Sequence, residues 1–332
     1  MTQHLVNDAA AIAYVQLQAT GINTRVYATR YPEYDFARLI YVESGGNPWA
    51  PGVMTFTSTE SGKARLLTAY SKDMPKAEIG QSNEIRTFKL AGIGYDYNIE
   101  EINTALAVVG GTLTDRKAAA ARRAYAKFMF NTAITGIPDL PGSVGLTNYT
   151  GVTATAAPAD GTGGVRTWVD AAGVGTKTPA QIVRDINIGI VGIFADTYQT
   201  ELADTVMLPL AAYAYIAQTP FSLTTQETIL SFIQRTNLYT LQTGRPLNFV
   251  FPPQGVLEAA GTATGAEGAG RMVVYKNDPE YVRLHLPMPH QFLPVYQDGW
   301  GHYEVPGIFR TGGVEILSTQ AVRYVDGITP AP

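Results

Sequence analysis

Hydrophobic and polar residues alternate over a long stretch of the first third of the chain. The segments "VMTFTSTES" (Val53–Ser61) and "IRTFKLAGIGYDY" (Ile85–Tyr97) place Thr, Val, Ile and Phe at partly alternating positions, which is typical of strands. Between them, "TAYSKDMPKAEIGQSN" (Thr68–Asn83) is polar and rich in turn formers. The pattern predicts a two-stranded excursion from Val53 to Asp96 with little core of its own.

Four segments have helical patterns. Asn7 can cap a short helix that Gly21 ends, and Thr114 can cap a longer one that runs to Gly136 and contains the helix formers Ala118–Ala121. The run Thr178-Pro179-Ala180-Gln181 resembles a capping box with proline at the first helical position, and it predicts a helix to about Tyr198. A further helix is expected to start near Thr224 or Thr225.

The remaining pattern consists of strands and loops. A short strand is expected at Val206–Leu208, and the segment Met272–Val325 reads mainly as strands. Small residues and glycine in Gly151–Gly164 and in Gly255–Arg271 indicate two loops.

Three of the four histidines lie in "HLPMPHQFLPVYQDGWGH", from His285 to His302. In the preceding strand, Val282, Leu284 and Leu286 share one face, which leaves Arg283 and His285 on the polar face. The prolines that follow, Pro287, Pro289 and Pro294, lack an N–H and therefore exclude a central strand position. His290 and His302 are expected on irregular backbone on either side of the turn signal "QDGWG".

Composition makes several classes of protein unlikely for this chain. The chain has 332 residues, only 16% of them charged, with a net charge of −4, which disfavours a strongly basic nucleic-acid binder. The absence of cysteine excludes disulfides and thiolate chemistry. The apolar run Val206–Ala217 is too short to span a bilayer, and Met1–Gly21 does not resemble a signal peptide, so a cytoplasmic protein is expected.

Enzyme chemistry finds little support in the residues. The cluster from His285 to His302 would suit a metal-dependent hydrolase, but no rigid two-histidine helical motif supports it, so surface or interface histidines are favoured. The loop "GTATGAEGAGR" lacks the Gly-Lys-Ser/Thr ending of a phosphate-binding loop. We therefore assign no catalytic, cofactor-binding or metal-binding residue and expect no cofactor.

The C-terminal segment "VPGIFRTGGVEILSTQAVRYVDGI" (Val305–Ile328) resembles the closing strands of the major capsid proteins of tailed bacteriophages and prophages. Upstream segments resemble the same family, from about Tyr31 onward and in the expected order. They are "KDMPKAEI" (Lys72–Ile79), "YDYNIEEI" (Tyr95–Ile102), "LTDRKAAAARRA" (Leu113–Ala124) and "RMVVYKNDPEYVRLHLPMP" (Arg271–Pro289). Each motif alone is weak, but the ordered combination is specific.

The resemblance implies the Hong Kong 97-type capsid fold, an α+β architecture. It predicts an N-terminal arm at residues 1–50, an extended hairpin (the E-loop) at 51–96 and a peripheral domain with a long spine helix at 97–140. An axial domain at 141–285 and return strands of the peripheral domain at 286–332 complete the expected fold. His285, His290 and His302 are then structural residues.

The resemblance also implies a function as a virion protein. Copies of the chain are expected to form hexamers and pentamers of an icosahedral shell around double-stranded DNA, assembled in the bacterial host cytoplasm with a portal and without a membrane. Because only about thirty residues precede the family-like region, a separate scaffolding protein is expected, and a decoration protein remains open. An encapsulin-type compartment is the closest alternative. Lys63, Lys72 and Lys76 are interpreted as surface lysines, and no cross-linking residues are assigned.

One basic stripe lies on the predicted spine helix. At 100° per residue, Arg123 and Lys127 fall within about 20° of Arg116, opposite a mostly apolar face. That apolar face consists of Ala121, Tyr125, Phe128, Met129 and Thr132. Phe130 breaks the pattern and is expected to meet a neighbouring segment. The spine helix of related capsids lies towards the inside of the shell, so the resemblance implies that Arg116, Arg123 and Lys127 face the lumen and the packaged DNA. An ordinary solvated face, or ion pairs to a neighbouring arm, is an equally favoured alternative.

Overall fold

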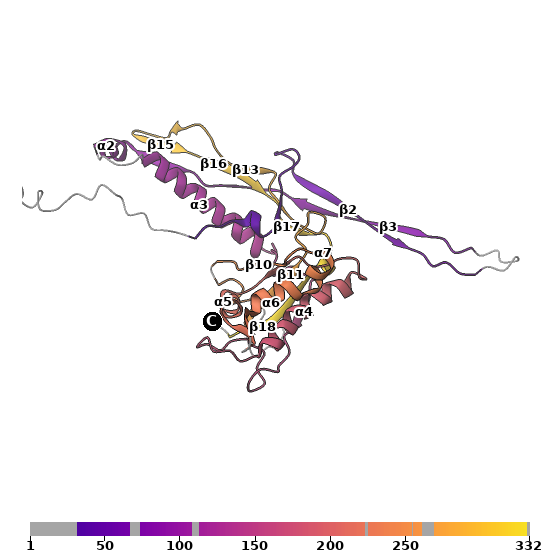
Figure 1. The fold of residues 1–332 in the computed structure, drawn as a ribbon. Coiled ribbons are helices and arrows are strands. Elements are labelled where there is room, and N and C mark those ends of the chain that lie inside the picture. The colour runs from indigo at the N-terminus through magenta and orange to yellow at the C-terminus, as the bar shows by residue number, and fades with distance from the viewer. Residues whose placement is uncertain are drawn as a thin grey trace, which may run out of the picture.

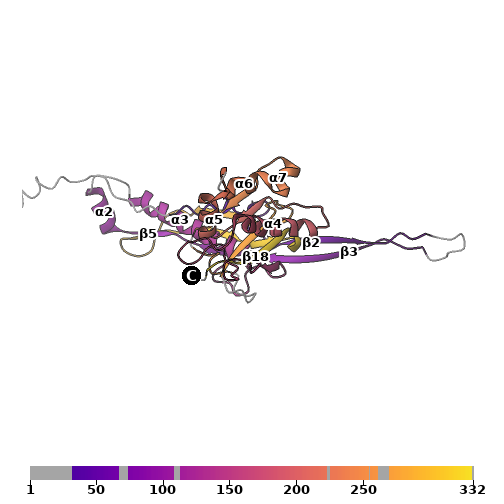
Figure 2. The ribbon, with the colours of Figure 1, turned by 60° about the horizontal axis from the view of Figure 1, so that its bottom comes forward.

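The computed structural model describes residues 32–66, 74–107, 113–222, 225–253, 255–260 and 269–330. Within them, a long hairpin and an arm built around helix α3 project in opposite directions from a lobe rich in helices (Figures 1 and 2). The helix expected at Asn7–Gly21 lies outside the described residues.

The hairpin consists of β2 (Gly52–Ser61) and β3 (Glu78–Thr87). All ten residues of each strand are paired in continuous antiparallel register, from Gly52 opposite Thr87 to Ser61 opposite Glu78. This agrees with the predicted two-stranded excursion, but the excursion ends at Thr87 rather than at Asp96. The chain then leaves the hairpin, because β4 (Lys89–Gly92) and β5 (Tyr95–Asn98) pair with strands from the C-terminal part of the chain.

The arm is built on α3, a 22-residue helix spanning Leu113–Ile134. Two small sheets accompany it, in the orders β13-β16-β4 and β14-β15-β5. Their other strands are β13 (Met288–Phe292), β14 (Tyr296–Gln297), β15 (His302–Val305) and β16 (Gly307–Thr311), and α2 (Ile99–Ala107) follows β5. The spine-helix prediction is confirmed to within two residues at each end, although Thr114 lies inside the first turn rather than at the cap.

The lobe contains a five-stranded sheet in the order β10-β7-β11-β18-β6. Its strands are β6 (Thr153–Ala156), β7 (Thr205–Met207), β10 (Asn248–Val250), β11 (Ala269–Tyr275) and β18 (Val322–Thr329). The helices of the lobe are α4 (Pro179–Asp196), α5 (Leu210–Gln218), α6 (Ile229–Thr236) and α7 (Leu238–Thr243), and a small hairpin joins β8 (Pro220–Ser222) to β9 (Thr225–Thr228).

This five-stranded sheet separates two hydrophobic cores. In β11, Met272 and Val274 pack with the helices of the lobe, whereas Val273 and Tyr275 pack with the end of α3 and with Leu39. Successive side chains of a strand point to opposite faces, so each face of the sheet belongs to a different core. A sheet buried on both faces explains why the strand reads as the uninterrupted apolar run "MVVY".

Another three-stranded sheet, in the order β1-β12-β17, connects the lobe, the arm and the hairpin. The parallel strand β1 (Tyr41–Glu43) and the antiparallel strand β17 (Gly313–Ile316) flank β12 (Val282–His285). Its central strand carries Arg283 and His285, and both point toward the base of the hairpin. The segment assigned to return strands, 286–332, is divided among several sheets, because β18 lies in the five-stranded sheet of the lobe. The domain boundaries therefore stay predictions.

Several local predictions are confirmed. The capping box is present at the start of α4, where the Thr178 N–H donates to the side chain of Gln181 at 2.8 Å and Pro179 is the first helical residue. The strand expected at Val206–Leu208 is β7. Pro289 lies in an edge strand at a register irregularity, as its missing N–H requires.

Other local predictions are wrong. The helix expected near Thr225 begins at Ile229, because Thr228 rather than Thr225 provides the cap, and residues 225–228 form β9. The apolar run after Val206 contains a helix, α5, that was not predicted. The loop expected at Gly151–Gly164 contains the edge strand β6, and Ala269–Arg271 at the end of the second loop belong to β11.

Candidate functional site

The large apolar side chains of the hairpin all lie on one face, which also carries Ser58, Glu60, Gln81 and Asn83, and the opposite face is mostly polar. Residues directly opposite each other in the antiparallel register share a face, so the pairs Met54–Ile85 and Glu60–Ile79 put these side chains on the face that also carries Phe56. Phe56 is 69% exposed and Ile79 is 65% exposed. An apolar face that remains in water on a projecting element is the signature of a contact made with another molecule.

The polar face of the hairpin contacts the body of the protein at its base. Arg283 from β12 donates to the Thr55 hydroxyl in β2 at 3.0 Å, and Arg86 in β3 donates to the Tyr149 hydroxyl at 2.6 Å. Each strand of the hairpin thus has one arginine hydrogen bond to the body. Beyond this base the described hairpin residues are exposed on both faces, so these contacts determine the direction in which the hairpin projects.

The base of the hairpin rests on a buried cluster of charges. One carboxylate oxygen of Glu315 accepts hydrogen bonds from Arg283 Nε and from His285 Nε2, both at 2.8 Å. Burial alone would raise the pKa of Glu315, but the hydrogen bonds from His285 and Arg283 outweigh it and lower that pKa to about 2. The other oxygen, Oε1, is buried without a hydrogen-bond partner in the described residues.

Polar contacts continue from the base of the hairpin into the lobe. The Tyr149 N–H donates to the hydroxyl of Tyr324 at 3.1 Å. The Arg271 guanidinium lies 4.3 Å from the ring centroid of Tyr324 and donates two hydrogen bonds to Asp326, at 2.7 and 2.8 Å. Arg271 and Asp326 belong to adjacent central strands of the five-stranded sheet. The hairpin base is therefore anchored to the most buried part of the molecule.

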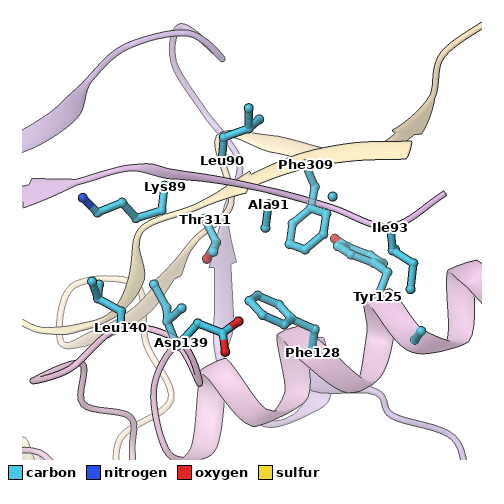
Figure 3. Close-up of a pocket in the computed structure, with 13 residues that line it drawn as sticks. Lys89, Leu90, Ala91, Ile93, Tyr125, Phe128, Asp139, Leu140, Phe309 and Thr311 are labelled. Atoms are coloured by element: carbon cyan, nitrogen blue, oxygen red, sulfur yellow. The ribbon is translucent and has the colours of Figure 1, made fainter. Parts of the chain in front are cut away.

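A groove of about 560 Å³ lies beside the hairpin base, between α3 and strands β4 and β16 (Figure 3). Its apolar floor contains Phe309, whose ring centroid lies 4.8 Å from that of Tyr125 and 5.4 Å from that of Phe128. Lys89 and Asp139 lie at one end of the groove. Phe309 itself is buried, whereas Tyr125 and Phe128 are half-buried, so the groove has an aromatic lining that is partly accessible to solvent.

The basic residues of α3 are exposed, as expected. Arg116, Arg123 and Lys127 are all exposed, whereas Ala121 and Met129 on the opposite face are buried. The amphipathic character of the helix is therefore confirmed. Nothing in the structure places the basic stripe relative to a shell lumen, so the DNA-facing role of these three residues stays a prediction.

Phe130 meets a neighbouring segment, as its position out of the pattern predicted. Its side chain is 1% exposed, and its ring centroid lies 5.4 Å from that of Tyr34. The segment that covers it leads through the short 3-10 helix η1 (Phe36–Arg38) into β1. Residues Tyr34 and Phe36 are thereby packed against α3.

The three histidines His285, His290 and His302 do not form one site. His285, His290 and His302 lie on β12, β13 and β15, which belong to three different sheets. The prediction of irregular backbone for His290 and His302 is wrong, because both are strand residues. The prediction of a polar, surface position for His285 is also wrong, since that side chain is buried against Phe88 and Glu315. Among the described residues, no group of three or more His, Asp or Glu side chains could hold a metal ion.

The chain is similar to one protein family and to several solved structures. A family model described as "Major capsid protein" matches residues 62–328. The capsid of Myoviridae Phage XM1 is similar in structure, with a TM-score of 0.75 and 17% identity over 94% of this chain and 98% of that chain. Structures from Microbacterium phage Oxtober96 and Mycobacterium phage Bobi have TM-scores of 0.61 and 0.60, each at 11% identity over 98% of this chain and 99% and 100% of theirs.

No curated protein matches the chain. None of the helices in the described ranges is long and apolar enough to cross a membrane.

Acid should weaken the hairpin base through Glu315. A carboxyl whose pKa is lowered on folding contributes stability above its unfolded value near 4.5, and that contribution is lost as the pH falls through about 2. Glu315→Gln should remove the negative charge that neutralises the Arg283 guanidinium and cost about 3–5 kcal/mol at neutral pH. Urea unfolding of the subunit from pH 7 to pH 2 measures both effects.

The expected result is a gap between parent and variant that is large at pH 7 and narrows below pH 4.5. Glu280→Gln, at an exposed position, is the matched control and should change little. Parallel stability curves for the parent and Glu315→Gln across this range would contradict the assignment.

Proposed function

The chain belongs to the major capsid protein family, since the family model covers most of its length, and on that premise we propose how copies of it build a shell around DNA. Each copy extends its hairpin over a neighbouring copy within a hexamer or pentamer, so that the apolar face of the hairpin becomes buried. Closed rings of such contacts form the capsomers of an icosahedral shell. The shell encloses the double-stranded DNA of a tailed phage.

One observation carries this proposal. Phe56, Ile79 and Ile85 lie on one face of a hairpin whose described residues make no tertiary core beyond the base. A two-stranded hairpin is at best marginally stable in water. A second copy of the chain is the one partner always present at high local concentration during shell assembly, and it supplies the missing surface.

The comparisons favour a phage capsid over the two alternatives. The family match and the phage capsids among the similar structures support a virion protein rather than an encapsulin-type compartment. The family consists of structural capsid proteins, so the hydrolase based on His285–His302 is not supported. Shells that contain cargo protein instead of nucleic acid would favour the compartment.

Other proteins complete the proposed assembly. A scaffolding protein would hold subunits in the correct curvature while the exposed hairpins find their partners, and a portal would occupy one vertex for DNA entry. A decoration protein would bind the finished shell. We place this assembly in the cytoplasm of the bacterial host and the product in the virion.

The packaged DNA is proposed to contact the basic stripe of α3. Arg116, Arg123 and Lys127 are exposed on the face opposite the packed side of the helix. Side chains of this kind offset phosphate charge without reading sequence.

Particle formation is the direct test of the proposed function. Co-expression of the chain with the scaffolding and portal proteins encoded beside it should give uniform closed shells in negative-stain micrographs. A monodisperse monomer under those conditions would show that the capsid proposal is wrong.

Removal of the outer hairpin should separate folding from assembly. The described residues within 58–82 are all exposed, and replacing this range with a short Gly-Ser turn leaves the base contacts of Thr55 and Arg86 in place. The free energy of unfolding of the subunit should therefore stay within about 1 kcal/mol of that of the parent, as expected for surface changes. The yield of shells should fall to background. Normal shells from this variant would contradict a role for the hairpin in assembly.

Removing the positive charges of the basic stripe should weaken the retention of DNA in filled shells. A variant with Arg116, Arg123 and Lys127 all replaced by glutamine should still form empty shells, because the buried face of α3 is untouched. DNA retention in filled shells should fall on heating, as measured by release of nuclease-sensitive DNA. Retention equal to that of the parent, or failure of empty shells to form, would refute the genome contact.

A further inference from the structure

A group of charged side chains is buried in the lobe and has no role in the assembly proposed above. Lys177 immediately precedes the Thr178 cap of α4, and Asp185 lies on the buried face of that helix, about two turns farther along. Neither side chain is exposed to solvent, and Lys177 Nζ lies 2.6 Å from Asp185 Oδ2. An amine and a carboxyl group are thereby held in contact where water does not reach them.

A second carboxylate lies beside the same amine. Asp160 Oδ1 is 3.3 Å from Lys177 Nζ. That oxygen is buried and accepts no hydrogen bond among the described residues, whereas Asp160 Oδ2 accepts one from Arg184 at 2.5 Å. The hydrogen bond from Arg184, together with the nearby charge of Lys177, lowers the pKa of Asp160 to about 2, so this carboxyl is ionised at neutral pH. Asp160 Oδ1 is therefore available to accept a proton from the amine.

Two donors polarise the carboxyl group of Asp185. Trp168 Nε1 donates to Asp185 Oδ2 at 3.1 Å, and Arg184 Nη2 donates to Oδ1 at 2.7 Å. Trp168 is completely buried, so its hydrogen bond does not compete with water. Donors in such positions stabilise the negative charge that develops on a carboxyl oxygen when an amine attacks the carbon. The cluster thus contains a nucleophile, an electrophile, a proton acceptor and donors to the developing oxyanion.

We propose that Lys177 and Asp185 become joined by an isopeptide bond between Nζ and Cγ, formed within the folded subunit by its own side chains. Away from water, an ammonium and a carboxylate in contact can exchange a proton and become a neutral amine and a carboxylic acid. Because the fold holds these two groups together, their reaction needs no bimolecular encounter. The bond forms inside one copy, so this proposal does not depend on shell assembly.

The reaction is a condensation and requires no oxidant, reductant or further reactant. The lone pair of the neutral Lys177 Nζ attacks Asp185 Cγ, and the carbonyl oxygen becomes an oxyanion. Asp160 Oδ1 accepts a proton from Nζ and returns it to the hydroxyl group of Asp185, which leaves as water when the oxyanion collapses to the amide. One C–N bond forms, one C–O bond breaks, and the chain loses one molecule of water.

The bond would hold the start of α4 and the loop before it in place. Two hydrogen bonds already bring this loop against the start of the helix, since Lys177 donates to the Pro158 carbonyl and Gln181 Nε2 donates to that of Asp160, both at 2.8 Å. Helix ends fray, and non-covalent contacts are lost when a segment opens locally. An amide bond across the first two turns of α4 would prevent this opening.

Mass spectrometry of the denatured full chain tests the proposal directly. The intact mass should lie about 18 Da, one water, below the mass calculated from the sequence. Trypsin should not cleave after Lys177, because its ammonium group has become an amide, and fragmentation should show a branched peptide that joins Lys177 to Asp185. Cleavage after Lys117 should be normal and is the internal control, since Lys117 contacts Glu101 at 2.7 Å but both side chains are partly exposed.

Two variants assign the roles of the side chains. Lys177→Arg keeps the positive charge but removes the amine, so it should have the full calculated mass. Asp160→Asn keeps the size of the side chain but cannot accept a proton, and it should lower the bonded fraction about tenfold or more. A parent chain of full mass that trypsin cleaves after Lys177 would show an ion pair only and overturn the proposal, as would a loss of water that persists in Lys177→Arg. Bonding of Asp160→Asn as complete as that of the parent would overturn the role of Asp160.

Discussion

A hairpin cannot bury its own apolar face, and the organisation of this protein follows from that constraint. The alternation of β2 and β3 places Met54, Phe56, Ile79 and Ile85 on one side of a two-stranded ribbon, and these side chains remain exposed among the described residues. Burial of apolar surface is the main favourable contribution to association. In the proposed assembly, the exposed apolar surface on each copy is the driving force for the shell.

A projecting surface is useful for assembly only when its direction is defined. Here Arg283 and Arg86 hold the two strands of the hairpin, while Glu315 holds Arg283 and His285 in turn. Charges buried in this way contribute little net stability, because desolvation offsets much of their attraction, but an incorrect arrangement is costly. The cluster therefore selects one hairpin direction. The line of contacts through Tyr149 and Tyr324 to Arg271 then ties that direction to the sheet between the two cores.

Features that depend on residues close together in the chain were predictable from the sequence. The hairpin followed from alternation, α4 from the capping box at Thr178, and the apolar face of α3 from helical spacing. The order of resembling segments predicted the fold as a whole.

Features built from distant segments could not be predicted in the same way. His285 was assigned to a polar surface because alternation cannot reveal that Phe88 and Glu315, far away in the chain, cover that face. The strand β6 consists of Thr and Ala and depends on its partner β18, so its composition resembles a loop. The groove combines α3, β4 and β16, and no single stretch of the sequence contains it. The opposite charges of Arg283 and Glu315 on neighbouring strand segments were the one available signal for the buried cluster.

The central claim is that the hairpin finds its missing surface on a neighbouring copy, and hydrogen exchange measures this most directly. Backbone amides of the described hairpin residues should exchange rapidly in free subunits, because a lone two-stranded ribbon opens readily. In assembled shells the same amides should be strongly protected, while the amides of β11 should be slow in both states because that strand is buried in the centre of the lobe. Equal protection of the hairpin in free subunits and in shells would contradict the account.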